Sequence, residues 1–204
     1  MSGADTQYAS PALCAGCHRK IADSFRKTGM GRSFYRLEPG QVIEDFSQNN
    51  TFNHAASERY YQLIARDGKY YQRRYQVDRT GNQINVVEKR IDYALGSGNH
   101  SRTYLTRTPE GRLLALPIAW YRENGGSWGM APGYDRPDHM DFRREINTEC
   151  IFCHNAYPRI APTPRDDPPR FLDPLPEGID CQRCHGPGRA HIEAANRGSA
   201  LSAI

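Results

Sequence analysis

Six cysteines and three histidines of this chain repeat one spacing three times. The string Cys-x-x-Cys-His occurs as Cys14-Cys17-His18 (the first motif), Cys150-Cys153-His154 (the second motif) and Cys181-Cys184-His185 (the third motif), and there is no other cysteine. In this pattern, two thiols about one helical turn apart add to the two vinyl groups of a haem, and the adjacent histidine ligates the iron. The sequence therefore predicts three covalent haem c groups, each with its own proximal histidine.

Two other kinds of cysteine site would use part of this pattern. A structural zinc site takes two Cys-x-x-Cys pairs, which the second and third motifs would provide. Zinc has no need of a histidine directly after each pair, and with 7 His in the chain three such coincidences are not expected by chance. A disulfide framework would not place all six cysteines in one repeated spacing. Haem is the stronger prediction of the three.

The composition is poor in large aliphatic side chains. Leu, Ile, Val and Phe make up about 17% of the 204 residues, a range in which a chain often cannot bury enough apolar surface to fold alone. The net charge of only +4 and the 12 tyrosines argue against disorder. We therefore expect a haem-centred core and an apo-chain that is largely unfolded. Haem propionates bring the net charge close to zero, so no nucleic-acid binding is predicted.

The expected cofactor also predicts a cellular location. Haem c is attached outside the bacterial cytoplasm, so we expect a periplasmic or extracellular protein. The N-terminus, Met-Ser-Gly-Ala-Asp, has no apolar signal core, and no stretch reaches transmembrane length. We expect that a signal peptide has been removed or replaced. The helical pattern of residues 190–204 stops abruptly, which suggests a fragment of a longer protein.

The pattern of side chains predicts an α+β fold with few helices, organised in three segments of one compact haem-cored domain. Residues 1–40 hold a helix over 10–28, capped by Ser10 and Pro11 and ended by Gly29, which carries the first motif. Residues 138–204 hold the other two motifs. A proline-rich stretch, Pro158 to Pro176, joins them, and we prefer an ordered loop over a haem face to a flexible linker.

The middle segment, residues 41–137, has no cysteine and reads as a β-rich insertion. Runs of Tyr, Ile and Val separated by glycine-containing turns predict an antiparallel meander of about four strands. The expected strands are Tyr60–Ala65, Tyr70–Val77, Ile84–Ile91 and Leu113–Tyr121. We expect this wall of strands to donate at least one axial ligand to a haem.

Four histidines outside the motifs are candidates for the sixth iron ligands, in the order His100, His191, His54 and His139. His100 lies in a glycine-rich turn that lets the backbone approach a porphyrin. His191 follows His185 too closely for both to hold one haem, so we expect it to ligate a neighbouring iron. Met30 is a further candidate ligand. There is one histidine more than the three predicted irons require.

Several strings resemble known multihaem proteins. Cys181–His191 resembles the multihaem cytochromes typified by the tetrahaem cytochrome c of ammonia-oxidising bacteria. Four further strings resemble a group of large exported bacterial proteins that join such a module to tetratricopeptide repeats: Thr28–Phe34, Gly96–His100, Trp128–Asp135 and Cys150–Pro158. The resemblance covers nearly the whole chain. It implies a fourth motif soon after residue 204, which would use the spare histidine, and a downstream repeat domain.

The chain departs from these cytochromes at one place. They usually have Ser-x-His after the first motif, where this chain has Thr28-Gly29-Met30. The main functional prediction is electron transfer through closely spaced, mainly bis-histidine haems, with redox proteins or further copies of itself as partners and no catalytic residue. One alternative is an oxidoreductase acting on a small nitrogen or sulfur species at a five-coordinate haem. The other is a polymerising cytochrome subunit.

Overall fold

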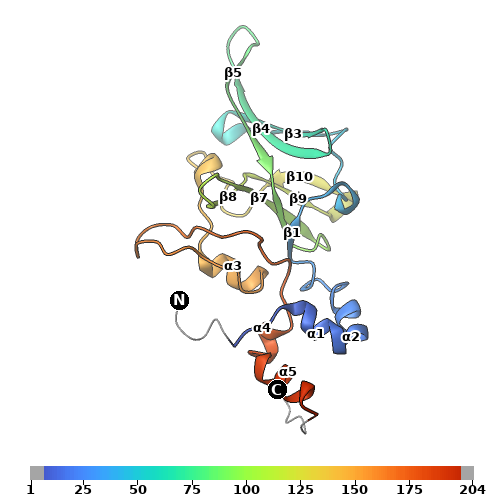
Figure 1. Ribbon diagram of the computed structural model, residues 1–204. Helices are drawn as coiled ribbons and strands as arrows, with labels where there is room; N and C mark the ends of the chain where they lie inside the picture. Colours follow the sequence, from blue (N-terminus) through green and yellow to red (C-terminus); the bar gives the residue numbers. More distant parts are fainter. Residues whose placement is uncertain (1–6, 199–204) are drawn as a thin grey trace.

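The computed structural model describes residues 7–198, in which helices gather at one end and two sheets form the other (Figure 1). The α-helices of this part are α1 (Pro11–Cys17), α2 (Arg19–Phe25), α3 (Thr148–His154), α4 (Gln182–His185) and α5 (Arg189–Asn196). The strands are β1 (Phe34–Arg36), β2 (Thr51–His54), β3 (Arg59–Arg66), β4 (Lys69–Val77), β5 (Gln83–Ile91), β6 (Tyr93–Leu95), β7 (Ser101–Arg107), β8 (Leu113–Ala115), β9 (Ile118–Tyr121) and β10 (Ser127–Met130). The predicted α+β class is confirmed.

The antiparallel meander of four strands is also confirmed, in the order β2-β3-β4-β5. Three of its strands are those predicted, and the turn between β3 and β4 uses Asp67 and Gly68 in the left-handed region, as a tight hairpin requires. The fourth member differs, because β2 takes the place of the predicted strand over 113–121. Pro117 has no N–H for a sheet ladder, and the backbone breaks there into β8 and β9, which belong to the second sheet.

The second sheet joins the beginning of the chain to the middle segment. Its order is β1-β6-β7-β9-β10, and β8 pairs with β7. β1 comes from the predicted first segment and pairs along its whole length with β6. We refer to residues 34–146, which hold both sheets, as the sheet region. The chain that follows the first motif thus enters the second sheet as its edge strand.

The sheet region has a side-chain core of its own. Tyr61, Leu63, Tyr104, Leu116 and Ile118 are fully buried in one apolar cluster that spans both sheets. A second cluster, in which Phe34, Leu113 and Phe171 are fully buried, packs α3 and the proline-rich loop against the second sheet. The sheet region therefore does not need haem as its core, because side chains from its strands pack on each other. A haem-centred core stays a prediction for the helices.

The helical end, which comprises α1, α2, α4 and α5, has almost no apolar core. Ala22 is the one apolar side chain of these four helices that is buried. The predicted helix over 10–28 is broken at His18, whose backbone angles (φ −104°, ψ 40°) lie outside the helical range. The predicted caps are confirmed, since Pro11 opens α1 and the Ser10 hydroxyl accepts the Ala12 N–H. Because short helices are not stable alone, a further apolar group must cover these four helices to stabilise them.

The proline-rich stretch between the second and third motifs is an ordered loop. Ile160 and Phe171 pair across it, and Phe171 is fully buried in the second apolar cluster. The loop is thereby held to the sheet region rather than free between two anchors. Within residues 7–198, no helix combines the length and the apolar character needed to span a membrane.

Candidate functional site

The three predicted haem motifs share one arrangement. Each lies on a short helix, with its first cysteine half-buried and its second cysteine exposed, and all six thiols are free. The first motif ends α1, the second ends α3, and the third forms α4. Because the second thiol of each pair points to solvent, each motif presents an open edge to which a flat group can attach.

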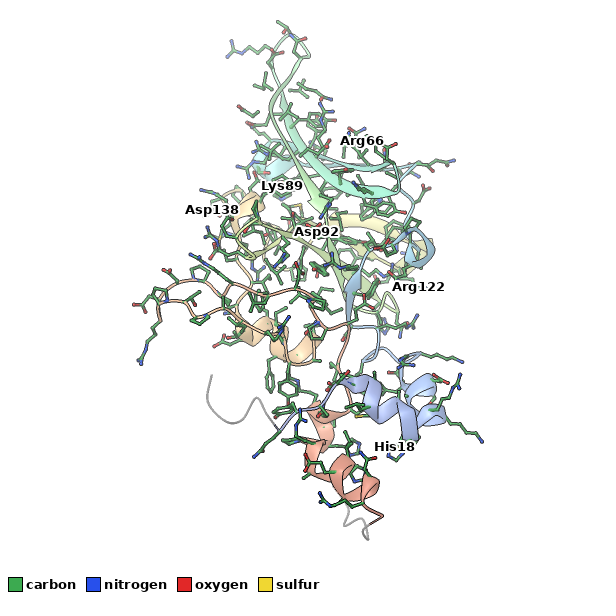
Figure 2. All side chains as sticks on the ribbon, in the orientation of Figure 1. His18, Arg66, Lys89, Asp92, Arg122 and Asp138 are labelled. Atoms are coloured by element: carbon green, nitrogen blue, oxygen red, sulfur yellow. The ribbon has the colours of Figure 1, made fainter. Side chains whose placement is uncertain are left out.

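His18 of the first motif faces His191 of α5. The centres of the two imidazole rings lie 6.2 Å apart and their planes differ by 23°. Figure 2 shows the His18 side chain on the side of α1 that faces α5. The turn Gly186-Pro187-Gly188 between α4 and α5 directs His191 to the first motif, away from the motif that it follows. Gly186 adopts a φ of 78°, which glycine allows without strain.

This histidine pair fits the axial ligands of a haem iron. Rings in face-to-face contact would lie roughly 3.5–4 Å apart, so the observed pair leaves space between them. Two metal–imidazole bonds of roughly 2 Å each, plus the distance from each nitrogen to its ring centre, give about 6 Å. Nδ1 of His191 is buried and has no hydrogen-bond partner among the described residues. The expectation that His191 ligates another motif's iron stays a prediction, and this geometry agrees with it.

Large apolar side chains stand exposed on the motif helices. Leu13 and Ile21 are 54% and 65% exposed on α1 and α2, and Phe152, inside the second motif, is 60% exposed. Large exposed apolar side chains indicate a surface that another apolar body covers. Porphyrin faces attached to the neighbouring cysteines are such bodies, so the surroundings of the motifs also fit haem.

The first and third motifs lie side by side. Burial raises the pKa of the Cys14 thiol, and the neighbouring Cys181 thiol and Asp180 carboxylate raise it further. Gln182, 3% exposed, donates from Nε2 to the Ala9 carbonyl (2.7 Å) and accepts the Ala9 N–H (2.8 Å). Its Oε1 also accepts the Gly188 N–H (3.1 Å), at the start of α5. One side chain thus holds the residues before α1, the third motif and the α5 helix together.

The proximal histidines of the other two motifs sit in different surroundings. Burial lowers the pKa of His154, which favours the neutral ring that ligates a metal. The Ser33 hydroxyl donates to the His154 carbonyl (2.7 Å), which joins the second motif to the segment after α2. His185 is exposed at the end of α4. The structure brings no histidine from outside the motifs into a ring contact with either of them within residues 7–198.

His54 and His139 lie together in the sheet region, with ring centres 5.6 Å apart. Both are buried, and each of their ring nitrogens has a protein partner. His54 contacts the Ser57 hydroxyl (2.8 Å) and the Asp135 carboxylate (3.2 Å). These contacts favour a packing role for His54 over a free ligand, although its ligation stays a prediction.

The His139 ring is held in its neutral form. Its Nδ1 accepts the Asp141 N–H (3.1 Å), and its Nε2 lies 3.2 Å from the Tyr61 hydroxyl. Burial lowers the pKa of His139, and the Arg59 guanidinium, 3.1 Å from Nε2, lowers it further. Its partners come from β3 and from its own loop, which makes His139 a link between the meander and the chain leading to the second motif.

His100 is exposed at the end of the loop between β6 and β7. The loop lies beside the segment that follows α2, where Arg32 donates to the Asn99 side chain (3.3 Å). Arg102, just after the loop on β7, fixes its end: it donates to both oxygens of Glu44 (3.0 and 3.1 Å), and both side chains are almost fully buried. The loop therefore offers His100 on the first-motif side of the molecule, and its ligand role stays a prediction.

Met30 is half exposed in the segment between α2 and β1, and its backbone carbonyl accepts the Ile179 N–H (3.1 Å). Its role as an iron ligand stays a prediction.

The sequence did not mark Gln182 and Arg183, which stand between the two cysteines of the third motif. No local pattern reveals their distant partners. Residues 7–198 contain no group of three or more His, Cys, Asp or Glu side chains placed to hold a metal ion by themselves. No family model, no curated protein and no solved structure matches the chain.

Proposed function

We propose that this chain is an exported c-type cytochrome that binds three haems covalently and transfers electrons between redox partners or copies of itself. The observation that carries the proposal is the pair His18 and His191. It combines a motif histidine with a histidine outside any motif, at a separation that suits one iron between them. A structural zinc site or a disulfide framework would not require that pairing.

The haems, when bound, supply one-electron redox couples. The residues of the chain hold and space them. The six cysteines would anchor them, and His18, His154 and His185 would be the proximal ligands. Gln182 keeps the first and third motifs adjacent through the two backbone bonds to Ala9. Short distances between redox centres would favour electron transfer over catalysis at one open site.

The test is the number of covalent haems. The chain should be exported in a bacterial host with haem c maturation and its intact mass measured after denaturation. We expect an increase of three haem units over the polypeptide. The double substitution Cys181→Ala, Cys184→Ala is the matched control and should carry two. A protein that retains zinc, forms disulfides or carries no covalent haem would refute the proposal.

A further inference from the structure

The two residues between the cysteines of the third motif point to different neighbours. Gln182 joins the third motif to the residue before α1, as described above. Arg183 reaches the second motif instead. Its Nη2 donates to the Asn155 carbonyl (3.0 Å) and to the Ala156 carbonyl, directly after α3. One spacer residue of the third motif thus contacts Ala9, upstream of the first motif, and the other contacts the second motif.

The Arg183 guanidinium also lies on two aromatic rings. Its central carbon is 4.4 Å from the ring centre of Phe152 and 3.9 Å from that of Tyr157. Phe152 stands between the two cysteines of the second motif, so the guanidinium occupies the space between two predicted haem attachment sites. Cation–π contacts of this kind hold an arginine in one place.

Among the described residues, the Arg183 guanidinium forms no ion pair, and its buried Nε has no hydrogen-bond partner. The Asp180 carboxylate accepts the backbone N–H of Arg183 (3.2 Å) and leaves the guanidinium itself unpaired. An arginine stays protonated at any physiological pH. At a half-buried position such as that of Arg183, a fixed charge is screened less than it would be in solution. A positive charge stabilises the reduced form of an iron centre, which carries one positive charge fewer, and so raises its reduction potential.

We propose that Arg183 is a positioning residue that fixes the second and third motifs against each other and raises the reduction potentials of both haems through its permanent charge. This inference rests on the proposed function. In this role Arg183 ligates no iron. Its side chain contributes in two ways, through the planar stacking contact and through its charge.

Midpoint potentials of the haem-loaded protein test the inference. Arg183→Met removes the charge and keeps the length of the side chain, and at least two of the three potentials should fall. Arg183→Lys keeps the charge without the planar fork, and its potentials should stay close to those of the unsubstituted protein. Arg165→Met is the matched control, since Arg165 is exposed in the loop between the same two motifs. Its potentials should not change.

Four outcomes would overturn the inference. Potentials that stay unchanged in Arg183→Met remove the electrostatic role. Potentials that fall equally in Arg183→Lys and Arg183→Met assign the effect to packing alone. If Arg183→Met loses a haem, Arg183→Gln, which keeps a donor for the two carbonyls, replaces it; haem loss in that variant and in Arg183→Lys makes Arg183 a structural residue only. A chain without covalent haem before any substitution defeats the proposed function, and the inference with it.

Discussion

The histidines outside the motifs differ in what their ring nitrogens contact. His54 and His139 use all four of their ring nitrogens on protein groups of the sheet region. His191 has a buried nitrogen without a partner and a ring that faces His18. An iron ligand must offer a free lone pair, so the surroundings of His191 suit ligation and those of His54 and His139 do not.

The spin state of the irons tests this difference. Replacing His191 by Ala should turn one of the three haem irons high-spin, because it removes one strong axial ligand and leaves the covalent attachment intact. The electron paramagnetic resonance spectrum of the ferric protein measures the change, and added imidazole should reverse it. His54→Gln is the control and should keep the spectrum of the unsubstituted protein. An unchanged spectrum in His191→Ala would contradict the assignment.

At this scale, the sequence predicts the attachment residues and leaves their neighbours open. The three motifs are local patterns whose chemistry depends on spacing alone. By contrast, Gln182 forms hydrogen bonds with Ala9, and His139 with Arg59 and Tyr61, and these partners lie far away in the sequence. Such contacts form only when the chain folds and brings distant residues together, so no local pattern reveals them.

Among the elements, strand β7 shows why several strands escaped prediction. Arg102, Tyr104 and Thr106 alternate along it and all three are buried. Polar side chains on the inner face hide the apolar alternation by which strands are recognised. The strands β3, β4 and β5 carry Tyr, Leu and Ile at alternating positions between clear turns, and these were predicted. The break at Pro117 and the one at His18 divide elements whose composition is continuous.

The buried ion pair of β7 has a measurable cost when broken. Arg102→Met leaves the Glu44 carboxylate buried with only the Tyr104 hydroxyl (2.6 Å) as a side-chain partner. We expect the free energy of unfolding of the haem-loaded protein to fall by about 3–5 kcal/mol, measured by denaturant titration. Arg66→Met is the control, because its pair with Glu88 is exposed, and it should cost about 0–1 kcal/mol. Equal losses in both variants would show that Arg102 does not anchor the His100 loop.

The whole molecule combines two ways of burying apolar surface. In the sheet region, side chains from both sheets pack on each other. At the helical end, four helices bury one apolar side chain and leave large ones exposed. The low content of Leu, Ile, Val and Phe reflects an average over these two regions, which is why composition alone could not show that one of them has its own core.

This division predicts partial folding without haem. In a variant with all six cysteines replaced by Ala, hydrogen exchange should stay slow for the amides of β3, β4 and β7, since their core consists of side chains. The amides of α1, α2, α4 and α5 should exchange quickly, because these helices lack a core. In the haem-loaded protein the helices should be protected as well. Fast exchange throughout the cysteine-free chain would mean that the sheet region also depends on haem.

The pairing of His18 with His191 has a consequence for how the protein is made. The two residues lie far apart in the sequence, and a chain exported as proposed would emerge with its N-terminus first. A group attached at the first motif would therefore wait for its second ligand until all residues between His18 and His191 had crossed the membrane. During that interval the sheet region can fold, and it carries β1 and the first motif into place before α5 arrives. A chain truncated before α5 would then be recognisable by an open coordination position at the first motif.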